Sequence, residues 1–532
     1  MFTNPDLIVT GGRVFDGRVL TKNSAVAVAG GRIVAIGLDE EILALASEST
    51  TVLQADGGLI HPGFVDAHAH AAFAGVERLS CDLTPARSVE ETLELIRKAA
   101  EASGTGWLTG GGWDHGLFPH PTRHMLDAVV PDRPVALSDN GHHTLWVNSA
   151  ALRLAGVDAG TPDPHNGHIH RDAEGEPTGY LNETAAELVG AHIPPATDAE
   201  IHRGILNAQE ALWELGVTGW HDPILGEYNG KADATGGYLA ALADGSLISR
   251  VSGALWIAPG LTEEQVPELV ARFVELRAKN AERGLETGTA KAMIDGVPHG
   301  ETAALLDSYC SHEGSGELHF DEAAIRAFVQ QLDAAGFALH LHIMGDRGVR
   351  VALDAIEAAR VSNGPGQRHH VAHLSMIHPD DARRFGPLGV TANMQALWAA
   401  PDPHVVPMIG THRMEAGYPF RDLANGGAEL AMGSDWPVSP ADPWLAIHVA
   451  VNRSVPGEQG VLDAAQALTL TAALAAYTSG SASLVLGGGG LLRVGERADV
   501  VLSQPNPFEG PTDALAGVRV TATVVAGMLM RR

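Results

Sequence analysis

Eight short apolar runs constrain the fold of this chain more than any other feature. Each run ends in polar residues, and from the second run onward helical patterns such as 263–283 and 321–335 lie between them. A strand–helix alternation repeated eight times predicts an α/β fold, a (β/α)8 TIM barrel. The runs are residues 63–70, 217–222, 248–257, 289–296, 338–345, 370–375, 390–395 and 429–435.

The chain segments outside these runs predict two additions to the barrel. About 145 residues separate the first run from the second, too many for one crossover helix, so we expect an insertion after barrel strand 1, at residues 75–200. Both chain ends carry short β-rich runs broken by glycine pairs, as hairpins do. Neither end can bury a core alone. We therefore expect residues 1–60 and 481–532 to form one small β-sandwich domain beside the barrel domain at 61–480.

Composition excludes several classes of partner. The chain carries 35 Lys+Arg against 64 Asp+Glu, a net charge of −29, which disfavours binding to nucleic acid or to an anionic membrane. No window offers 18 uninterrupted apolar residues and no basic segment follows Met1, so we expect a cytoplasmic protein without a membrane span. With only two cysteines, a metal would have to be held by His, carboxylate or modified Lys.

Ligand-type side chains end several of the runs. His68 and His70 alternate at the end of the first run, so both side chains share one face and can chelate one cation. Such a triplet is weak by itself, because residues 168–170 and 340–342 repeat it. His342, His373 and Asp435 end the fifth, sixth and eighth runs. Since the strand ends of a barrel meet at one mouth, these five residues predict a metal centre; a set of hydrogen-bonded core histidines is the alternative.

Lys291 is one of only five lysines and lies within the fourth run, among small and apolar neighbours. Burying an ammonium group costs several kcal/mol, so a lysine on a barrel strand needs a chemical reason. Carboxylation by CO2 would convert it to a carbamate that can bridge two metals. The alternative is a lysine that reaches solvent or pairs with Asp295.

Several motifs in order along the chain now support a resemblance. The segment 63–70, with Lys on the fourth strand, His on the fifth and sixth and Asp on the eighth, resembles the amidohydrolase superfamily. Further segments are similar to the YtcJ-like branch of amidohydrolase family 3. They are residues 30–37, 112–114, 143–149, 291–296, 342–347, 433–437 and 495–502. The resemblance spans nearly the whole chain.

This resemblance implies a site and a reaction. One or two divalent metals, usually zinc, are expected in the barrel mouth, with His68, His70 and Asp435 on the inner metal. His342 and His373 would hold the outer metal, and carboxylated Lys291 would bridge both. A metal-bound hydroxide would attack a carbonyl, while Asp435 acts as general base and then as general acid toward the leaving nitrogen. The expected reaction is hydrolysis of a non-peptide C–N bond in an amide, such as an N-substituted formamide or an N-acyl amine.

Other functions stay open at this point. A cyclic-amide hydrolase, a deaminase or an esterase of the same superfamily is an alternative, although deaminases tend to be mononuclear and to lack the strand-four lysine. A non-catalytic metal-binding barrel is a rival from a different class, which the loss of a ligand would favour. The expected partner is a small-molecule amide, and a homodimer is one candidate for the oligomeric state.

Substrate contacts are expected from the insertion and from the loops after the strands. His143 is placed near the substrate carbonyl, and Glu183 either reaches the metals or substrate or lies on a helix face. His299 is a substrate contact or a loop histidine. Aromatic residues in these segments favour an apolar N-substituent, or else they are ordinary core residues. The remaining candidates are Trp113, Asp114 and Trp436.

Overall fold

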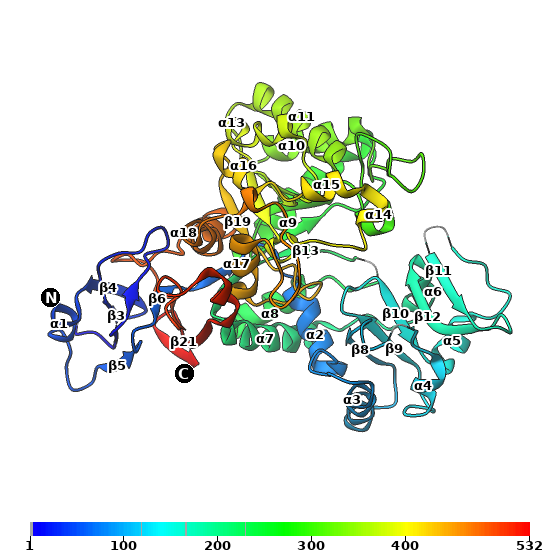
Figure 1. The fold of residues 1–532 in the computed structure, drawn as a ribbon, viewed down its shortest axis with the longest axis horizontal. Helices are drawn as coiled ribbons and strands as arrows, with labels where there is room; N and C mark the ends of the chain where they lie inside the picture. Colours follow the sequence, from blue (N-terminus) through cyan, green and yellow to red (C-terminus); the bar gives the residue numbers. More distant parts are fainter. Residues whose placement is uncertain (1–3, 119, 165–166, 229, 532) are drawn as a thin grey trace.

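A computed structural model of the chain describes residues 4–118, 120–164, 167–228 and 230–531. Its centre is an eight-stranded parallel sheet in which each strand pairs with the next one along the barrel sequence (Figure 1). Each predicted run overlaps one of these strands, so the barrel prediction is confirmed. The strands are β7 (Phe64–Asp66), β13 (Val217–Leu225), β14 (Arg250–Trp256), β15 (Glu286–Met293), β16 (Ala338–Ile343), β17 (His370–His373), β18 (Thr391–Met394) and β19 (Leu430–Met432).

The sheet nearly closes on itself between its first and last strands. Ala67 donates its backbone N–H to the carbonyl of Met432 at 3.1 Å, and Asp435 donates to the carbonyl of His68 at 2.7 Å. These bonds lie just beyond the ends of β7 and β19. Closure therefore brings the residues that follow the two strands into contact, although more than 350 positions separate them in sequence.

Helices surround the sheet because each presents an apolar stripe to it, as in α10, where Ile325, Phe328 and Leu332 are buried at helical spacing. α11 follows the same pattern. The main barrel helices are α7 (Asp198–Glu214), α8 (Thr235–Ala243), α9 (Val266–Glu282), α10 (Glu322–Ala334), α11 (Asp346–Asn363), α16 (Phe420–Asn425), α17 (Pro443–Asn452), α18 (Leu470–Ala475) and α19 (Ser481–Val485). No helix within the described ranges is both long and apolar enough to span a membrane.

A second sheet lies in the chain between β7 and β13, and Figure 1 shows it at one side of the barrel. Its order is β11-β12-β10-β9-β8, with helices packed along it. The strands are β8 (Leu108–Trp113), β9 (Val135–Asp139), β10 (Thr144–Val147), β11 (Gly167–Arg171) and β12 (Pro177–Glu183). The helices of this segment are α2 (Ala71–Cys81), α3 (Val89–Ala102), α4 (Arg123–Asp127), α5 (Ser149–Ala155) and α6 (Thr184–Gly190).

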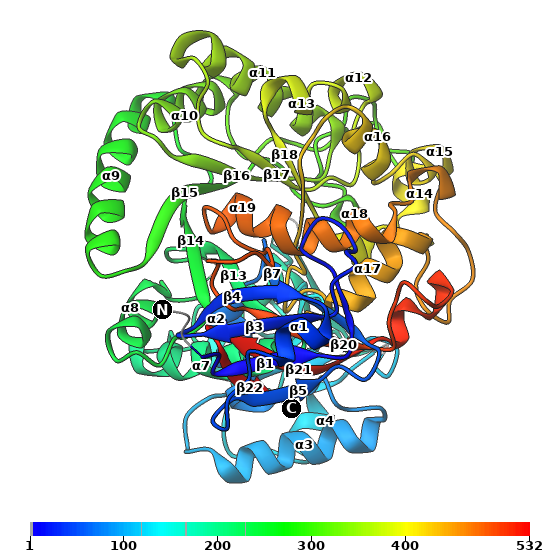
Figure 2. The same cartoon turned by 90° about the vertical axis from the view of Figure 1, so that its left-hand side faces the viewer.

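The two chain ends share one sheet and a core (Figures 1 and 2). One sheet has the order β4-β3-β1-β5, and the other joins β2 and β6 to three C-terminal strands in the order β2-β6-β20-β21-β22. The strands are β1 (Leu7–Thr10), β2 (Arg13–Val14), β3 (Ala25–Ala29), β4 (Arg32–Gly37), β5 (Thr51–Gln54), β6 (Leu59–Pro62), β20 (Val500–Gln504), β21 (Arg519–Val525) and β22 (Met528–Arg531). The domain boundaries given above stay a prediction.

Candidate metal centre

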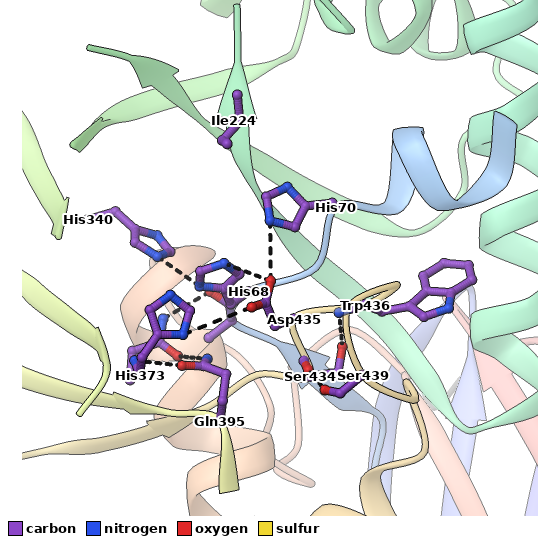
Figure 3. Close-up of polar contacts among 12 residues, drawn as sticks. His68, His70, Ile224, His340, His373, Gln395, Ser434, Asp435, Trp436 and Ser439 are labelled. Atoms are coloured by element: carbon purple, nitrogen blue, oxygen red, sulfur yellow. Dashed lines mark hydrogen bonds and ion pairs between the residues drawn. The ribbon is translucent and has the colours of Figure 1, made fainter. Parts of the chain in front are cut away.

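Three of the predicted ligands meet where β7 and β19 end. His68 and His70 follow β7, and Asp435 follows β19. Asp435 Oδ1 lies 3.3 Å from His68 Nε2 and 3.2 Å from His70 Nε2, so one carboxylate oxygen faces two imidazole nitrogens (Figure 3). Ligand atoms of the three residues all lie within 4.8 Å of one another. A single cation can reach all of them.

A buried carboxylate holds the two ligand segments together. Asp66 Oδ1 accepts the backbone N–H of His68 and that of Ser434, each at 3.0 Å.

The backbone of Asp435 has φ +60°, and that of His373 has φ +76°. Side chains rarely adopt this left-handed region, and strained backbone of this kind clusters at functional sites where the surrounding structure enforces it.

The predicted outer ligands lie next to this group. The rings of His342 and His373 are 4.4 Å apart, and His373 Nδ1 lies 4.0 Å from Asp435 Oδ2. Trp398 stacks on His373 with ring centroids 5.1 Å apart, and Gln395 accepts the His373 backbone N–H at 2.7 Å. The side chain and the backbone of His373 are therefore both fixed.

The donor set fits a divalent cation. Several buried polar atoms at this mouth have no hydrogen-bond partner among the described residues: His70 Nδ1, His342 Nδ1, both ring nitrogens of His373, and Asp435 Oδ1. Buried polar atoms left without partners cost free energy. Imidazole nitrogens and carboxylate oxygens are ordinary ligands of zinc. A bound cation would satisfy the lone pairs that the protein leaves unpaired here.

The protonation states suit such binding. Burial lowers the pKa of His68 to about 4 and the pKa values of His342 and His373 well below the ordinary range. Burial opposes ionisation of Asp435, yet its contacts with His68 and His70 hold its pKa well below the usual value. At neutral pH the site therefore offers neutral imidazoles and one carboxylate, which is the form in which these groups bind metals.

Lys291 lies in β15 and is 2% exposed. Burial lowers the pKa of its amine to about 7, and no hydrogen bond or ion pair of this amine occurs within the part of the chain that the structure describes. Asp295 is not its partner, because that carboxylate accepts the backbone N–H groups of Ala304, Met344 and Gly345. Burial thus favours the neutral form of the amine, which is the form that can react with CO2.

Comparison with known proteins decides the family. A family model described as "Amidohydrolase family" matches residues 51–530. The chain belongs to the amidohydrolase family. It is 30% identical over 495 residues to the putative amidohydrolase YtcJ of Bacillus subtilis, covering 91% of each chain. It is 27% identical to the N-substituted formamide deformylase of Arthrobacter pascens, covering 95% of this chain and 94% of the relative.

Solved structures agree with this assignment. An uncharacterized metal-dependent hydrolase from Pyrococcus furiosus superimposes with a TM-score of 0.72 at 26% identity, covering 93% of this chain and 98% of the other. The family match and the similar relatives show that this chain is an enzyme, a hydrolase that acts on C–N bonds. The metal centre described above is therefore the candidate active site of an amidohydrolase.

The segment of this amidohydrolase between β7 and β13 contributes a charged pair. His143 Nδ1 lies 3.1 Å from Glu183 Oε1, and the Glu183 backbone N–H donates to the His143 carbonyl at 2.8 Å. Glu183 has φ +51° and lies at the end of β12, so it is not on a helix face. Its hydrogen bond raises the pKa of His143. Both side chains are about half exposed and can meet a substrate.

Other candidate contacts are placed differently. Trp113 is buried in the core of the insertion and donates its indole N–H to the carbonyl of Leu137, so it packs rather than lines an open surface. Asp114 is exposed and accepts the backbone N–H of Gly116 in a turn. His299 pairs with Asp402 at 2.9 Å. The indole of Trp436 extends away from the imidazole rings (Figure 3).

A second histidine layer lies beneath the candidate metal ligands of this amidohydrolase and does not belong to the site that the sequence predicts. His221, His340 and His370 come from β13, β16 and β17, are buried, and place ring nitrogens within 4.8 Å of one another. The repeat of His340 and His342 in one strand was the available signal, because residues two apart share a face.

Proposed function

We propose that this amidohydrolase is a metal-dependent enzyme that cleaves a non-peptide amide bond, such as an N-substituted formamide or an N-acyl amine. The observation that carries the proposal is the placement of Asp435 Oδ1 between His68 Nε2 and His70 Nε2 at the barrel mouth. The family assignment supports hydrolysis of a C–N bond. The similarity to an N-substituted formamide deformylase supports the substrate class.

Asp435 would be the residue that moves protons. A divalent cation held by His68, His70 and Asp435 would supply a water molecule with its pKa lowered toward about 7. The Asp435 carboxylate is ionised at neutral pH, so it can accept the proton of that water. It can then return the proton to the leaving nitrogen, which departs as a neutral amine and leaves a carboxylic acid.

His143 would bind the substrate carbonyl from the side of the segment between β7 and β13. Its pKa is raised by Glu183, so a larger share of the imidazole carries the second proton near neutral pH. A protonated imidazole can donate a hydrogen bond to a carbonyl oxygen as negative charge develops there. Glu183 orients the ring through Nδ1, which leaves Nε2 for the substrate.

Lys291 would complete a two-metal centre as a carbamate. Its neutral amine nitrogen would attack the carbon of CO2 and lose a proton, which forms the N–C bond and an anion. That anion would place a negatively charged ligand beside His342 and His373. The same proposal includes one or two zinc ions per chain.

A substrate screen with metal analysis tests the proposal. Purified enzyme loaded with zinc is incubated with N-formyl, N-acetyl and cyclic amides and with matched esters, and free amine or alcohol is measured. We expect amine release from at least one linear amide, with activity lost on chelation and restored by zinc. A folded preparation that binds no zinc even with added bicarbonate would contradict the metal-dependent hydrolase. Preferred turnover of cyclic amides or esters would contradict the linear-amide assignment.

A further inference from the structure

The layer beneath the metal centre contacts one of its ligands directly. His340 Nε2 lies 3.0 Å from His68 Nδ1, and both rings are fully buried (Figure 3). The opposite ring nitrogen of His68, Nε2, faces Asp435 at 3.3 Å. One ring nitrogen of this imidazole thus faces a carboxylate at the mouth, and the other faces a histidine from the barrel interior.

The chemistry of imidazole makes this contact directional. A neutral imidazole carries one proton and one lone pair, so His68 can bind a cation through Nε2 only when its proton is on Nδ1. The Nδ1–H then donates to His340 Nε2, which must be unprotonated. Metal-binding histidines are usually fixed in this way by an acceptor on the other nitrogen.

We infer that His340 is a positioning residue, which accepts the Nδ1–H of His68 and so aims the Nε2 lone pair of His68 at the metal centre. The inference rests on the proposed metal-dependent function. His340 supplies no ligand to that centre. It fixes the tautomer and the ring plane of His68, which is a proposed ligand.

Two further imidazole rings pack against His340. The His221 ring stacks on it with centroids 5.4 Å apart and planes 14° from parallel, and the His370 ring lies 4.3 Å away. His221 Nδ1 is 2.8 Å from Ser252 Oγ. Burial keeps all three rings neutral, because it lowers the pKa of His221 to about 3 and those of His340 and His370 well below the ordinary range.

The hydrogen bonds of His370 argue against a second metal ion within this layer. Asn393 Nδ2 donates to the carbonyl of Ala67 at 3.0 Å, and Asn393 Oδ1 accepts from Gln395 Nε2 at 3.3 Å, so the amide orientation is fixed. The same Nδ2 lies 3.2 Å from His370 Nδ1, which must then accept. The proton of neutral His370 is therefore on Nε2, and that nitrogen has no lone pair for a metal.

Zinc affinity of the full-length protein tests the inference. Metal-free wild type is compared with His340→Phe, which removes the acceptor, with His340→Gln, which restores an oxygen acceptor near Nε2, and with His221→Phe as a matched control in the same layer. Affinity is measured by competition with a chromogenic chelator, and the cobalt-substituted proteins are compared by their visible absorption. Circular dichroism verifies that each variant is folded.

We expect His340→Phe to bind zinc about 10–100-fold more weakly, with an altered cobalt spectrum. His340→Gln recovers most of the affinity, and His221→Phe keeps wild-type affinity and stoichiometry. Wild-type affinity in folded His340→Phe would overturn the inference, as would an equal loss in His221→Phe. If His340→Phe does not fold, loss of zinc affinity in folded His340→Gln equal to that of a His68→Ala variant would also overturn it.

The outcomes separate this inference from the proposed function. If the wild type binds zinc and the variants behave as expected, but no amide is hydrolysed, the positioning role stands and the proposed function fails. If amides are hydrolysed and His340→Phe binds zinc normally, the proposed function stands and the positioning role fails. A wild type that binds no zinc would overturn both.

Discussion

His143 Nδ1 lies 3.1 Å from Glu183 Oε1, although 40 positions separate the two residues in the chain. His143 follows the turn between β9 and β10, and Glu183 ends β12, which pairs with β10. Strand pairing in the sheet between β7 and β13 therefore creates this pair. Its half-exposed side chains are the contribution of this sheet to the proposed active site.

The first prediction concerns this pair. Glu183→Gln removes the carboxylate that raises the pKa of His143, so the protonated imidazole is lost at a lower pH. The limb of the kcat/KM profile that falls with rising pH should move to lower pH, and kcat/KM on that limb should fall about 10²-fold. Exposed Glu174 in the same insertion is the control, as Glu174→Gln. Identical pH profiles for Glu183→Gln and wild type would contradict the role of the pair.

The second prediction concerns Asp435. Replacing it by Asn keeps the shape of the side chain but removes the base, so kcat should fall about 10²–10⁴-fold while circular dichroism is unchanged. Chelation should abolish wild-type activity, and added zinc should restore it in the wild type but not in Asp435→Asn. Activity of the wild type that survives exhaustive chelation would contradict a metal-dependent reaction.

The third prediction is a pH dependence of stability. The pKa of Lys291 is about 7 in the folded protein and about 10.4 in an unfolded chain. Between these values the unfolded chain binds more protons, so the free energy of unfolding rises with pH, by at most about 1.4 kcal/mol per pH unit from this group. Below about pH 7, Lys291 is protonated in both the folded and the unfolded state, so its contribution to the free energy of unfolding does not change with pH.

The Lys291→Met variant should lack the rise in the free energy of unfolding that Lys291 causes as the pH increases. Urea unfolding of metal-free protein in CO2-free buffer, between about pH 7 and pH 10, should give a smaller increase for the variant than for the wild type. Lys279 is the control, because it is exposed and pairs with Glu275 at 2.6 Å, so Lys279→Met should keep the wild-type slope. Parallel curves for Lys291→Met and wild type would show that Lys291 titrates normally in the folded state.

The fourth prediction concerns the closure of the barrel. A Cβ at Gly433 would lie 2.5 Å from the His68 backbone nitrogen and 2.8 Å from the His68 Cβ, so Gly433→Ala must push β19 away from β7. We expect a loss of about 1–3 kcal/mol in stability and lower zinc content, measured by thermal unfolding and metal analysis. Gly288→Ala is the control, since no other heavy atom lies within 4 Å of a Cβ there. Equal zinc content in the two variants would contradict the effect on the site.

Local sequence patterns were sufficient to predict the barrel. The eight runs and the helical stripes between them predict strands and helices because burial of one face imposes a period of two or of 3.6 residues on the sequence. The same period predicts that His68 and His70 share a face. Which of these residues bind metal, and whether Lys291 is carboxylated, stays a prediction.

Contacts between residues on different strands could be identified only from the folded chain. Sequence alone placed Lys291 on a barrel strand and left pairing with Asp295 open, and the structure shows Asp295 occupied by backbone N–H groups instead. The hydrogen bond of His340 to His68 was not foreseen, because it joins β16 to the end of β7.

The sequence by itself thus determined the fold class, the family resemblance and the types of ligand at the ends of the strands. Only the tertiary structure decided which nitrogen of each histidine faces a carboxylate and which faces a second histidine. The reason is physical: side-chain alternation is a local property of one strand, whereas the depth of a residue in the barrel depends on how neighbouring strands are staggered when the sheet closes.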